Sequence, residues 1–158
     1  MEKLWAPWRG KFVSNISDDD ECFLCRVLKE DNDGDNYVLK RGEKVFAILN
    51  RYPYNTGHLM VVPNRHVAEF EELDEDESLE LLRMTKRMIV ALKGSMYPHG
   101  INVGMNLGRS AGAGVVGHIH LHIVPRWDGD TNFMPVIGGT KVLPHDLPTV
   151  FKLLEDRL

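Results

Sequence analysis

Three histidines alternate with apolar residues in the second half of the chain. His118, His120 and His122 stand at i, i+2 and i+4, with Ile119 and Leu121 between them. Side chains two residues apart on a β-strand point to the same face, so this spacing predicts a row of imidazoles opposite an apolar face. Such imidazoles can share a metal ion, or one can attack phosphorus while its neighbours hold the oxygens of the reacting group. The row is the predicted centre of the chemistry.

A pair of cysteines near the N-terminal end offers further candidate ligands. Cys22 and Cys25 are the two cysteines of the chain, so it lacks the disulfide framework of small secreted domains. A pair with this spacing is a redox dithiol, half of a zinc site, or two incidental thiols. The spacing alone does not choose among these three interpretations.

A glycine-rich segment at residues 108–114, Gly-Arg-Ser-Ala-Gly-Ala-Gly, leads straight into the histidine row. Segments of this composition often serve only as connectors. Here the backbone N–H groups are little shielded by side chains, and they are predicted to lie beside the reacting face. The segment is therefore a candidate for holding phosphate oxygens.

Apolar patterns predict the elements that position these residues. Five strands are predicted at residues 37–40, 44–49, 58–62, 101–107 and 118–124, with a short hairpin turn over residues 41–43. Residues 74–96 have the pattern of one long amphipathic helix, and Asp74 with Glu77 predicts a capping box at its start. A short C-terminal helix is predicted from about Asp146, with Val150, Leu153 and Leu154 on its apolar side.

Composition places limits on the class of protein. A chain of 158 residues with 43% apolar content predicts a single domain over residues 1–158, of which residues 1–16 form an aromatic and basic N-terminal arm. A net charge of −4 argues against a nucleic-acid partner. The sequence has no apolar run that could span a membrane and no signal-peptide core, so we expect a cytoplasmic protein without a membrane partner. The apolar arm favours a homodimer or a larger homo-oligomer.

The histidine row, followed by two apolar residues, resembles the signature of the histidine triad (HIT) family of nucleotide hydrolases and transferases. The similarity covers most of the chain and includes the segment from Phe46 to Asn50 and the segment from Gly57 to Pro63. It implies a HIT-like α+β fold, which has a five-stranded antiparallel sheet and is usually paired into a dimer. The strand count expected from the apolar pattern is the same.

The resemblance also implies roles for individual residues. His120 would attack the α-phosphorus of a nucleotide and form a nucleotidyl-histidine, and His122 would hold a non-bridging oxygen. Water or inorganic phosphate would then release the nucleotide, and no organic cofactor is needed. The residues expected to bind substrate are Asn50 at the ribose, Asn106 at the phosphates, and Gly112, Ala113, Gly114 and Trp127.

The family's zinc-containing members suggest one interpretation of the cysteines. In those members a Cys-x-x-Cys pair joins a histidine that follows a Pro-x-x segment and the first histidine of the row. The matching positions here are Cys22, Cys25, His66 and His118. The resemblance therefore implies a structural zinc site with a Cys₂His₂ ligand set, which would leave His120 and His122 free for chemistry.

Several segments are similar to the branch of the family that cleaves diadenosine tetraphosphate with phosphate. They include Trp-Ala-Pro-Trp-Arg at residues 5–9, Val115 where many members carry a hydroxyl residue, and Trp127 after the row. The implied function is a dinucleoside polyphosphate phosphorylase or hydrolase. Two alternatives stay open: a zinc-dependent phosphoester metallohydrolase in which all three histidines of the row bind the metal, and a purine-nucleotide-binding module without turnover.

Overall fold

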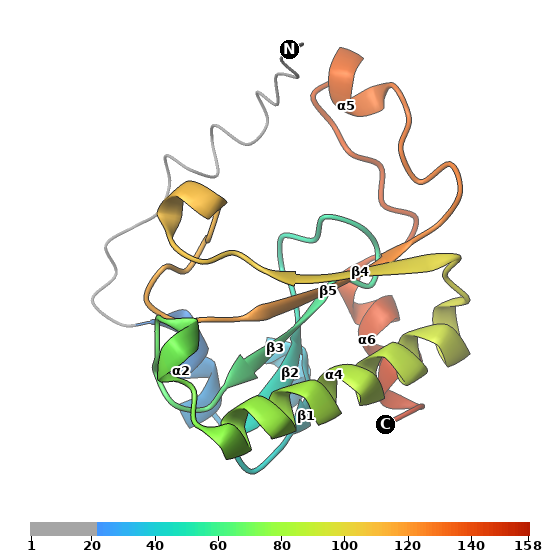
Figure 1. Cartoon of the computed structure of the whole chain (residues 1–158). Helices are drawn as coiled ribbons and strands as arrows, with labels where there is room; N and C mark the ends of the chain where they lie inside the picture. The colour runs from blue at the N-terminus through green and yellow to red at the C-terminus, as the bar shows by residue number, and fades with distance from the viewer. Residues whose placement is uncertain (1–21) are drawn as a thin grey trace.

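A five-stranded antiparallel sheet forms the centre of the computed structural model, which describes residues 22–158 (Figure 1). Its strands are β1 (Val38–Arg41), β2 (Val45–Leu49), β3 (Leu59–Pro63), β4 (Gly100–Met105) and β5 (Leu121–Arg126), in the spatial order β1-β2-β3-β5-β4. The predicted number of strands and their antiparallel pairing are confirmed. The predicted N-terminal arm lies outside the described residues.

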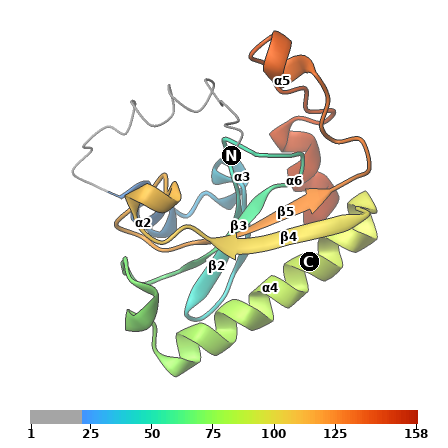
Figure 2. The ribbon, with the colours of Figure 1, turned by 45° about the horizontal axis from the view of Figure 1, so that its top comes forward.

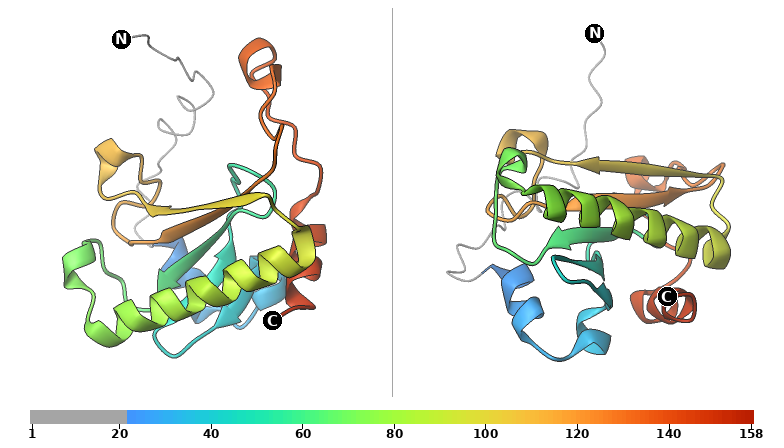
Figure 3. Two further views of the ribbon diagram at one scale, coloured as in Figure 1. Left: turned by 45° about the vertical axis from the view of Figure 1, so that its right-hand side comes forward. Right: turned by 60° about the horizontal axis from the view of Figure 1, so that its bottom comes forward.

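Helices and short turns connect and cover these strands. They are α2 (Phe23–Lys29), α3 (Asp33–Asn36), α4 (Glu75–Met96), α5 (Met134–Ile137) and α6 (Leu147–Glu155), with 3-10 turns η2 (Phe70–Glu72) and η3 (Arg109–Ala111). The long helix and the short C-terminal helix are thus confirmed as α4 and α6. Figure 3 shows α5 standing away from the sheet, at the tip of the segment between β5 and α6. Among the helices of residues 22–158, none is long and apolar enough to cross a membrane.

The two faces of the sheet carry separate apolar clusters. On one face α4 and α6 pack against residues that include Val61, Leu121 and Ile123, and Figure 2 shows α4 running along the sheet. On the other face Leu24 and Val27 of α2 pack against a cluster that contains Met60. Both clusters use strands of the same sheet.

Strand β5 begins later than the histidine spacing suggests. It starts at Leu121, so only His122 of the row lies within the strand, opposite Met60 of β3 and Gly104 of β4. Cross-strand partners share a face of the sheet, which places His122 on the α2 side. The segment before β5 is tied down instead by the Ile119 N–H, which donates to the Val67 carbonyl at 2.7 Å.

The predicted capping box at the start of α4 is confirmed. The Asp74 carboxylate accepts from the Glu77 N–H at 2.7 Å, and the Glu77 carboxylate accepts from the Asp74 N–H at 3.0 Å. Glu77 is buried and also pairs with Arg65 at 2.8 Å. This pair anchors the segment that follows β3, and the next residue in that segment is His66.

Leu153 is the exception to the predicted apolar side of α6. Val150 and Leu154 are buried, whereas Leu153 is 37% exposed. In a nine-residue helix the side that packs on α4 and β1 is narrow, and Leu153 falls outside it.

Truncating the two leucines of α6 should therefore have different effects on stability. We expect Leu154→Ala to lower the free energy of unfolding by about 2–5 kcal/mol, because it leaves a cavity in the core shared with α4. The matched control Leu153→Ala removes a half-exposed side chain from the same helix and should cost less than about 1 kcal/mol. Urea unfolding measures both, and equal losses would contradict the packing of α6 described here.

Candidate active site and metal centre

Two cysteines and two histidines from distant parts of the chain form one cluster. Cys22 occupies the N-cap position of α2 and Cys25 lies in its first turn, and both sulfur atoms lie near the His118 ring. Cys25 Sγ lies 3.2 Å from His66 Nδ1 and 3.6 Å from His118 Nδ1, and Cys22 Sγ lies 3.4 Å from His118 Nδ1. All four ligand atoms lie within 4.8 Å of one another. The structure thus brings together the four residues predicted as metal ligands.

These distances fit the edges of a tetrahedral metal site. Zinc–sulfur and zinc–nitrogen bonds of about 2.3 and 2.0–2.1 Å at tetrahedral angles separate the two donors by about 3.6 Å. His118 Nε2 donates to the Pro63 carbonyl at 2.8 Å, so in the neutral ring Nδ1 keeps its lone pair toward the sulfurs. Within residues 22–158 this is the one group of possible metal ligands found, and neither His120 nor His122 belongs to it.

His120 has the opposite proton arrangement. Its Nδ1 lies 2.9 Å from the carbonyl oxygen of His118, which can only accept a hydrogen bond. Nδ1 therefore carries the proton, and Nε2 is left with a free lone pair. Burial lowers the pKa of the ring, against a smaller opposing effect of this hydrogen bond, so His120 is neutral at pH 7. A neutral imidazole with an unprotonated Nε2 is a competent nucleophile.

A fourth histidine, His58, sets the state of His122. The Tyr54 N–H donates to His58 Nδ1 at 3.0 Å, so the proton of His58 resides on Nε2. That nitrogen lies 2.9 Å from His122 Nδ1 and donates to it, which leaves the proton of His122 on Nε2. Burial is the main cause that lowers the pKa of His58 to about 3 and that of His122 to about 4, and repulsion from neighbouring histidines adds to it.

The three histidines of the row therefore differ in chemistry. His118 presents a lone pair on Nδ1, His120 presents one on Nε2, and His122 presents an N–H on Nε2. The rings of His120 and His122 lie 4.7 Å apart between centroids and nearly perpendicular, at 80°. A nitrogen lone pair on His120 and an N–H group on His122 thus belong to neighbouring rings.

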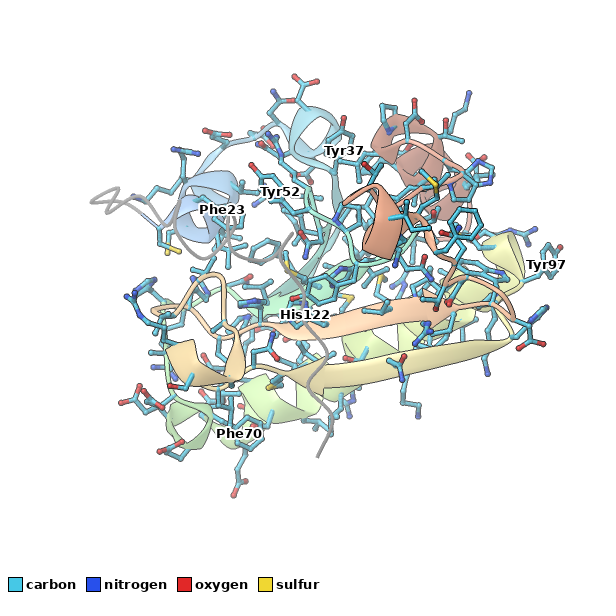
Figure 4. All side chains as sticks on the ribbon, turned by 90° about the horizontal axis from the view of Figure 1, so that it is seen from above. Phe23, Tyr37, Tyr52, Phe70, Tyr97 and His122 are labelled. Carbon is cyan, nitrogen blue, oxygen red and sulfur yellow. The ribbon has the colours of Figure 1, made fainter. Side chains whose placement is uncertain are left out.

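A cavity of about 410 Å³ opens beside His122, which lies near the centre of the molecule alongside β5 (Figure 4). Asn106 lines it, with its amide nitrogen Nδ2 3.4 Å from His122 Nε2; because both nitrogens carry N–H groups in this proton arrangement, the two donors face the same space and do not bond to each other. Gly104, the partner of His122 on β4, also lines it, and a Cβ there would meet no atom within 4 Å. Arg126 and Lys141 lie along the same cavity. Its walls thus supply amide and cationic groups suited to phosphate oxygens.

The other residues that are predicted to bind substrate lie outside this cavity. The Asn50 amide donates to His58 Nδ1 at 3.4 Å, so Asn50 joins the chain of contacts that ends at His122. The glycine-rich segment contains η3, and the Gly112 carbonyl lies 3.5 Å from the Asn106 amide. Ala113 is buried and Gly114 is half-buried beside it. Asn50, Gly112, Ala113 and Gly114 do not line the cavity at His122.

Trp127, which is predicted to bind substrate, lines a neighbouring cavity and not the one at His122. Sequence reasoning missed one feature of the site, the role of His58. His58 received no role, because it is a single histidine at the start of an apolar strand and pattern alone does not distinguish it from a packed residue. The register of β3 against β5, with Leu59 opposite Ile123, brings it to His122.

The comparisons with known proteins agree on one family. Residues 32–129 match the HIT domain model. An AP-4-A phosphorylase of Mycobacterium tuberculosis is 42% identical over 161 residues, which cover 98% of this chain and 83% of that protein.

Two solved structures have the same fold as this chain. A hypothetical histidine triad nucleotide-binding protein of Sulfolobus tokodaii superposes with a TM-score of 0.70 at 30% identity, covering 86% of this chain and 91% of its own. A Zn-bound histidine triad family protein of Mycobacterium smegmatis superposes with a TM-score of 0.71 at 24% identity, covering 87% and 93%.

The buried neutral histidines predict a pH dependence of stability. Unfolded histidines bind protons near pH 6.5, whereas His122 and His58 bind them only near pH 4 and 3 in the folded protein. Between these values the unfolded state holds more protons, so the free energy of unfolding falls as the pH drops from about 6.5 toward 4. Each ring contributes at most about 1.4 kcal/mol per pH unit. Urea unfolding at several pH values measures this slope.

A single substitution tests the contribution of His58. We expect His58→Gln to flatten the slope, because it removes one of the groups that bind protons only on unfolding. Identical slopes in His58→Gln and the wild type would argue against the buried neutral state of His58.

Proposed function

Because this chain belongs to the HIT family, we propose that it is an enzyme that splits dinucleoside polyphosphates through a nucleotidyl-histidine. The single observation that carries the proposal is the proton arrangement of the row, in which His120 Nε2 is unprotonated while His122 presents an Nε2 proton beside it. Phosphoryl chemistry needs this combination of nucleophile and donor.

The first step forms a bond between His120 Nε2 and the α-phosphorus of the substrate. The bond from that phosphorus to the bridging oxygen breaks, and with diadenosine tetraphosphate the leaving group is ATP. The His118 carbonyl holds the proton on His120 Nδ1 and stabilises the positive charge that develops on the ring. A phosphorus-bound imidazole is a good leaving group, which prepares the second step.

The residues around His120 stabilise the charge at phosphorus. His122 donates from Nε2 to a non-bridging oxygen, and Asn106 offers its amide to the same region. Removing one such donor from a preorganised site costs about 2.7–4 kcal/mol in the comparable oxyanion holes. His58 acts as a positioning residue, because its contact with His122 Nδ1 keeps the proton of His122 on the nitrogen that faces the substrate.

The second step transfers the nucleotide to an acceptor. An oxygen of inorganic phosphate attacks the phosphorus, the P–N bond breaks, and ADP leaves; with water in place of phosphate the product is AMP. We favour phosphate as the acceptor. The support is the AP-4-A phosphorylase of M. tuberculosis, which is 42% identical over 98% of this chain.

We further propose that Cys22, Cys25, His66 and His118 hold a structural zinc ion. The support is the fit of the donor separations to tetrahedral edges and the His118–Pro63 contact, which orients Nδ1 toward the sulfurs. A bound zinc ion would supply a cross-link between α2, the segment after β3 and the segment before β5. That cross-link would fix the backbone carbonyl of His118, to which His120 donates.

Pairing of two chains is also a proposal. Strand β4 is an edge of the sheet, and Val103 on the strand and Leu107 just after it are substantially exposed. An unpaired edge with exposed apolar side chains supports a homodimer.

The proposed intermediate predicts distinct results for two histidines. Wild-type protein incubated with diadenosine tetraphosphate labelled in the α-phosphate should give a base-stable, acid-labile adduct, and His120→Ala should give none and lose at least about 10³-fold in kcat. With phosphate present the products should be ATP and ADP in equal amounts. His99→Gln, which alters an exposed histidine that does not line the cavity at His122, should match the wild type. Full activity of His120→Ala would overturn the mechanism.

The zinc proposal predicts a metal content that follows the four ligands. Purified protein should contain about one zinc per chain by elemental analysis, and Cys25→Ser should lose it together with several °C of Tm. His120→Ala should keep its zinc, because His120 lies outside the ligand cluster. Retention of zinc by Cys25→Ser, or its loss from His120→Ala, would contradict the ligand set.

A further inference from the structure

A second cavity lies next to the one at His122 and has no part in the mechanism above. Its volume is about 460 Å³, within the usual range for small-molecule sites. Its walls come from the segment after β2, the end of α4, α6 and the long segment between β5 and α6 that Figure 1 shows rising from the sheet. Six of the lining residues are Thr56, Ser95, Met96, Trp127, Val142 and Leu153.

Three segments of the chain line both cavities, so the two share a rim. Residues 54–56 contribute Tyr54 to the first, Thr56 to the second and Asn55 to both. Arg126 and Lys141 line the first cavity, and the residue that follows each of them, Trp127 or Val142, lines the second. A ligand that fills the first cavity therefore has a short path into the second.

The rim carries positive charge on the side of the first cavity. Arg126 is held by Asp130, with 2.6 Å between its Nε and a carboxylate oxygen, and is largely neutralised there. Lys141 contacts the Tyr54 carbonyl, and among residues 22–158 no carboxylate lies within ion-pair distance of it. Its ammonium group is thus available to a phosphate chain that crosses the rim.

The second cavity combines apolar walls with an unsatisfied hydroxyl. Trp127 and Met96 provide flat and adaptable apolar surface. Thr56 is 2% exposed, and its Oγ1 has no hydrogen-bond partner. A buried hydroxyl without a partner costs about 1–3 kcal/mol, and a ring nitrogen or an exocyclic amine of a ligand would satisfy it. A planar heterocycle with polar edges matches both features.

We propose that the second cavity binds the base of the second nucleoside of a dinucleoside polyphosphate. The inference rests on the proposed function and extends it to the leaving half of the substrate. The reacting phosphate lies at His120 and His122, the polyphosphate chain crosses the rim at Lys141, and the distal base contacts Trp127 and Thr56. This arrangement gives Trp127, predicted to bind substrate, a place in the site although it lies outside the cavity at His122.

The test compares two substrates that differ only in the second nucleoside. Diadenosine tetraphosphate and adenosine 5′-tetraphosphate share the first nucleoside and four phosphates. Thr56→Val should lower kcat/KM for the dinucleotide about 5–10-fold, as expected for one lost hydrogen bond, and leave the mononucleotide within about 2-fold. Trp127→Leu should lower it for the dinucleotide by about 10-fold or more through lost stacking. Equal effects on the two substrates, or none, overturn the proposal.

Two features keep the test interpretable. Thr56→Val removes an unsatisfied buried group at nearly constant volume, so it should not lower the free energy of unfolding. The matched control is Thr85→Val, which alters a buried threonine on α4 whose hydroxyl donates to the Leu81 carbonyl, and which should not distinguish the substrates.

A binding measurement separates failure of this inference from failure of the proposed function. Calorimetry with non-cleavable methylene-bridged analogues of the same two compounds requires no turnover. We expect the dinucleotide analogue to bind the wild type about 10-fold more tightly than the mononucleotide analogue, and Trp127→Leu to abolish the difference. Equal affinities in the wild type would overturn the second-base site even if the enzyme turns over; a clear preference without turnover would support the site and reject the reaction.

Discussion

The chemistry of this site depends on hydrogen bonds that fix one proton on each buried imidazole. A neutral imidazole has one N–H and one lone pair, so a neighbour that can only accept or only donate decides which nitrogen reacts. The Pro63 carbonyl fixes the proton on His118 Nε2, and the His118 carbonyl fixes the proton on His120 Nδ1. The Tyr54 N–H bonds to His58 Nδ1 and so leaves the proton of His58 on Nε2. Backbone groups, whose positions are set by the fold, therefore assign a different task to each histidine.

The pairing of β3 with β5 is what places these backbone groups. The end of β3 supplies the Pro63 carbonyl, and the residue before its start is His58, which contacts His122 across the strand pair. A shift of register by one residue would turn His122 to the face covered by α4 and separate it from His58. The apolar clusters on the two faces oppose such a shift, because Leu121 and Ile123 pack with α4 while Met60 packs with α2.

Much of the fold and part of the site could be predicted from the sequence. Apolar alternation and the Asp74–Glu77 pair are local signals, and the strands and the start of α4 agree with them. The resemblance brought Cys22, Cys25 and His66 together with the first histidine of the row. The proton arrangement and the role of His58 could not be predicted, because they depend on contacts across strands. The cavity that Trp127 lines could not be predicted either, because it is made by segments far apart in the chain.

Burial also resolves a conflict between nucleophilicity and the binding of a polyanion. Protonated histidines would attract phosphate but could not attack it, and the lowered pKa values of His58, His120 and His122 keep these rings neutral at pH 7. Positive charge is instead placed at the rim, where Asp130 offsets Arg126 and leaves Lys141 to face the cavity. In the proposed mechanism, attraction of the phosphate chain and attack on phosphorus are thus carried by different residues, so neither function limits the other.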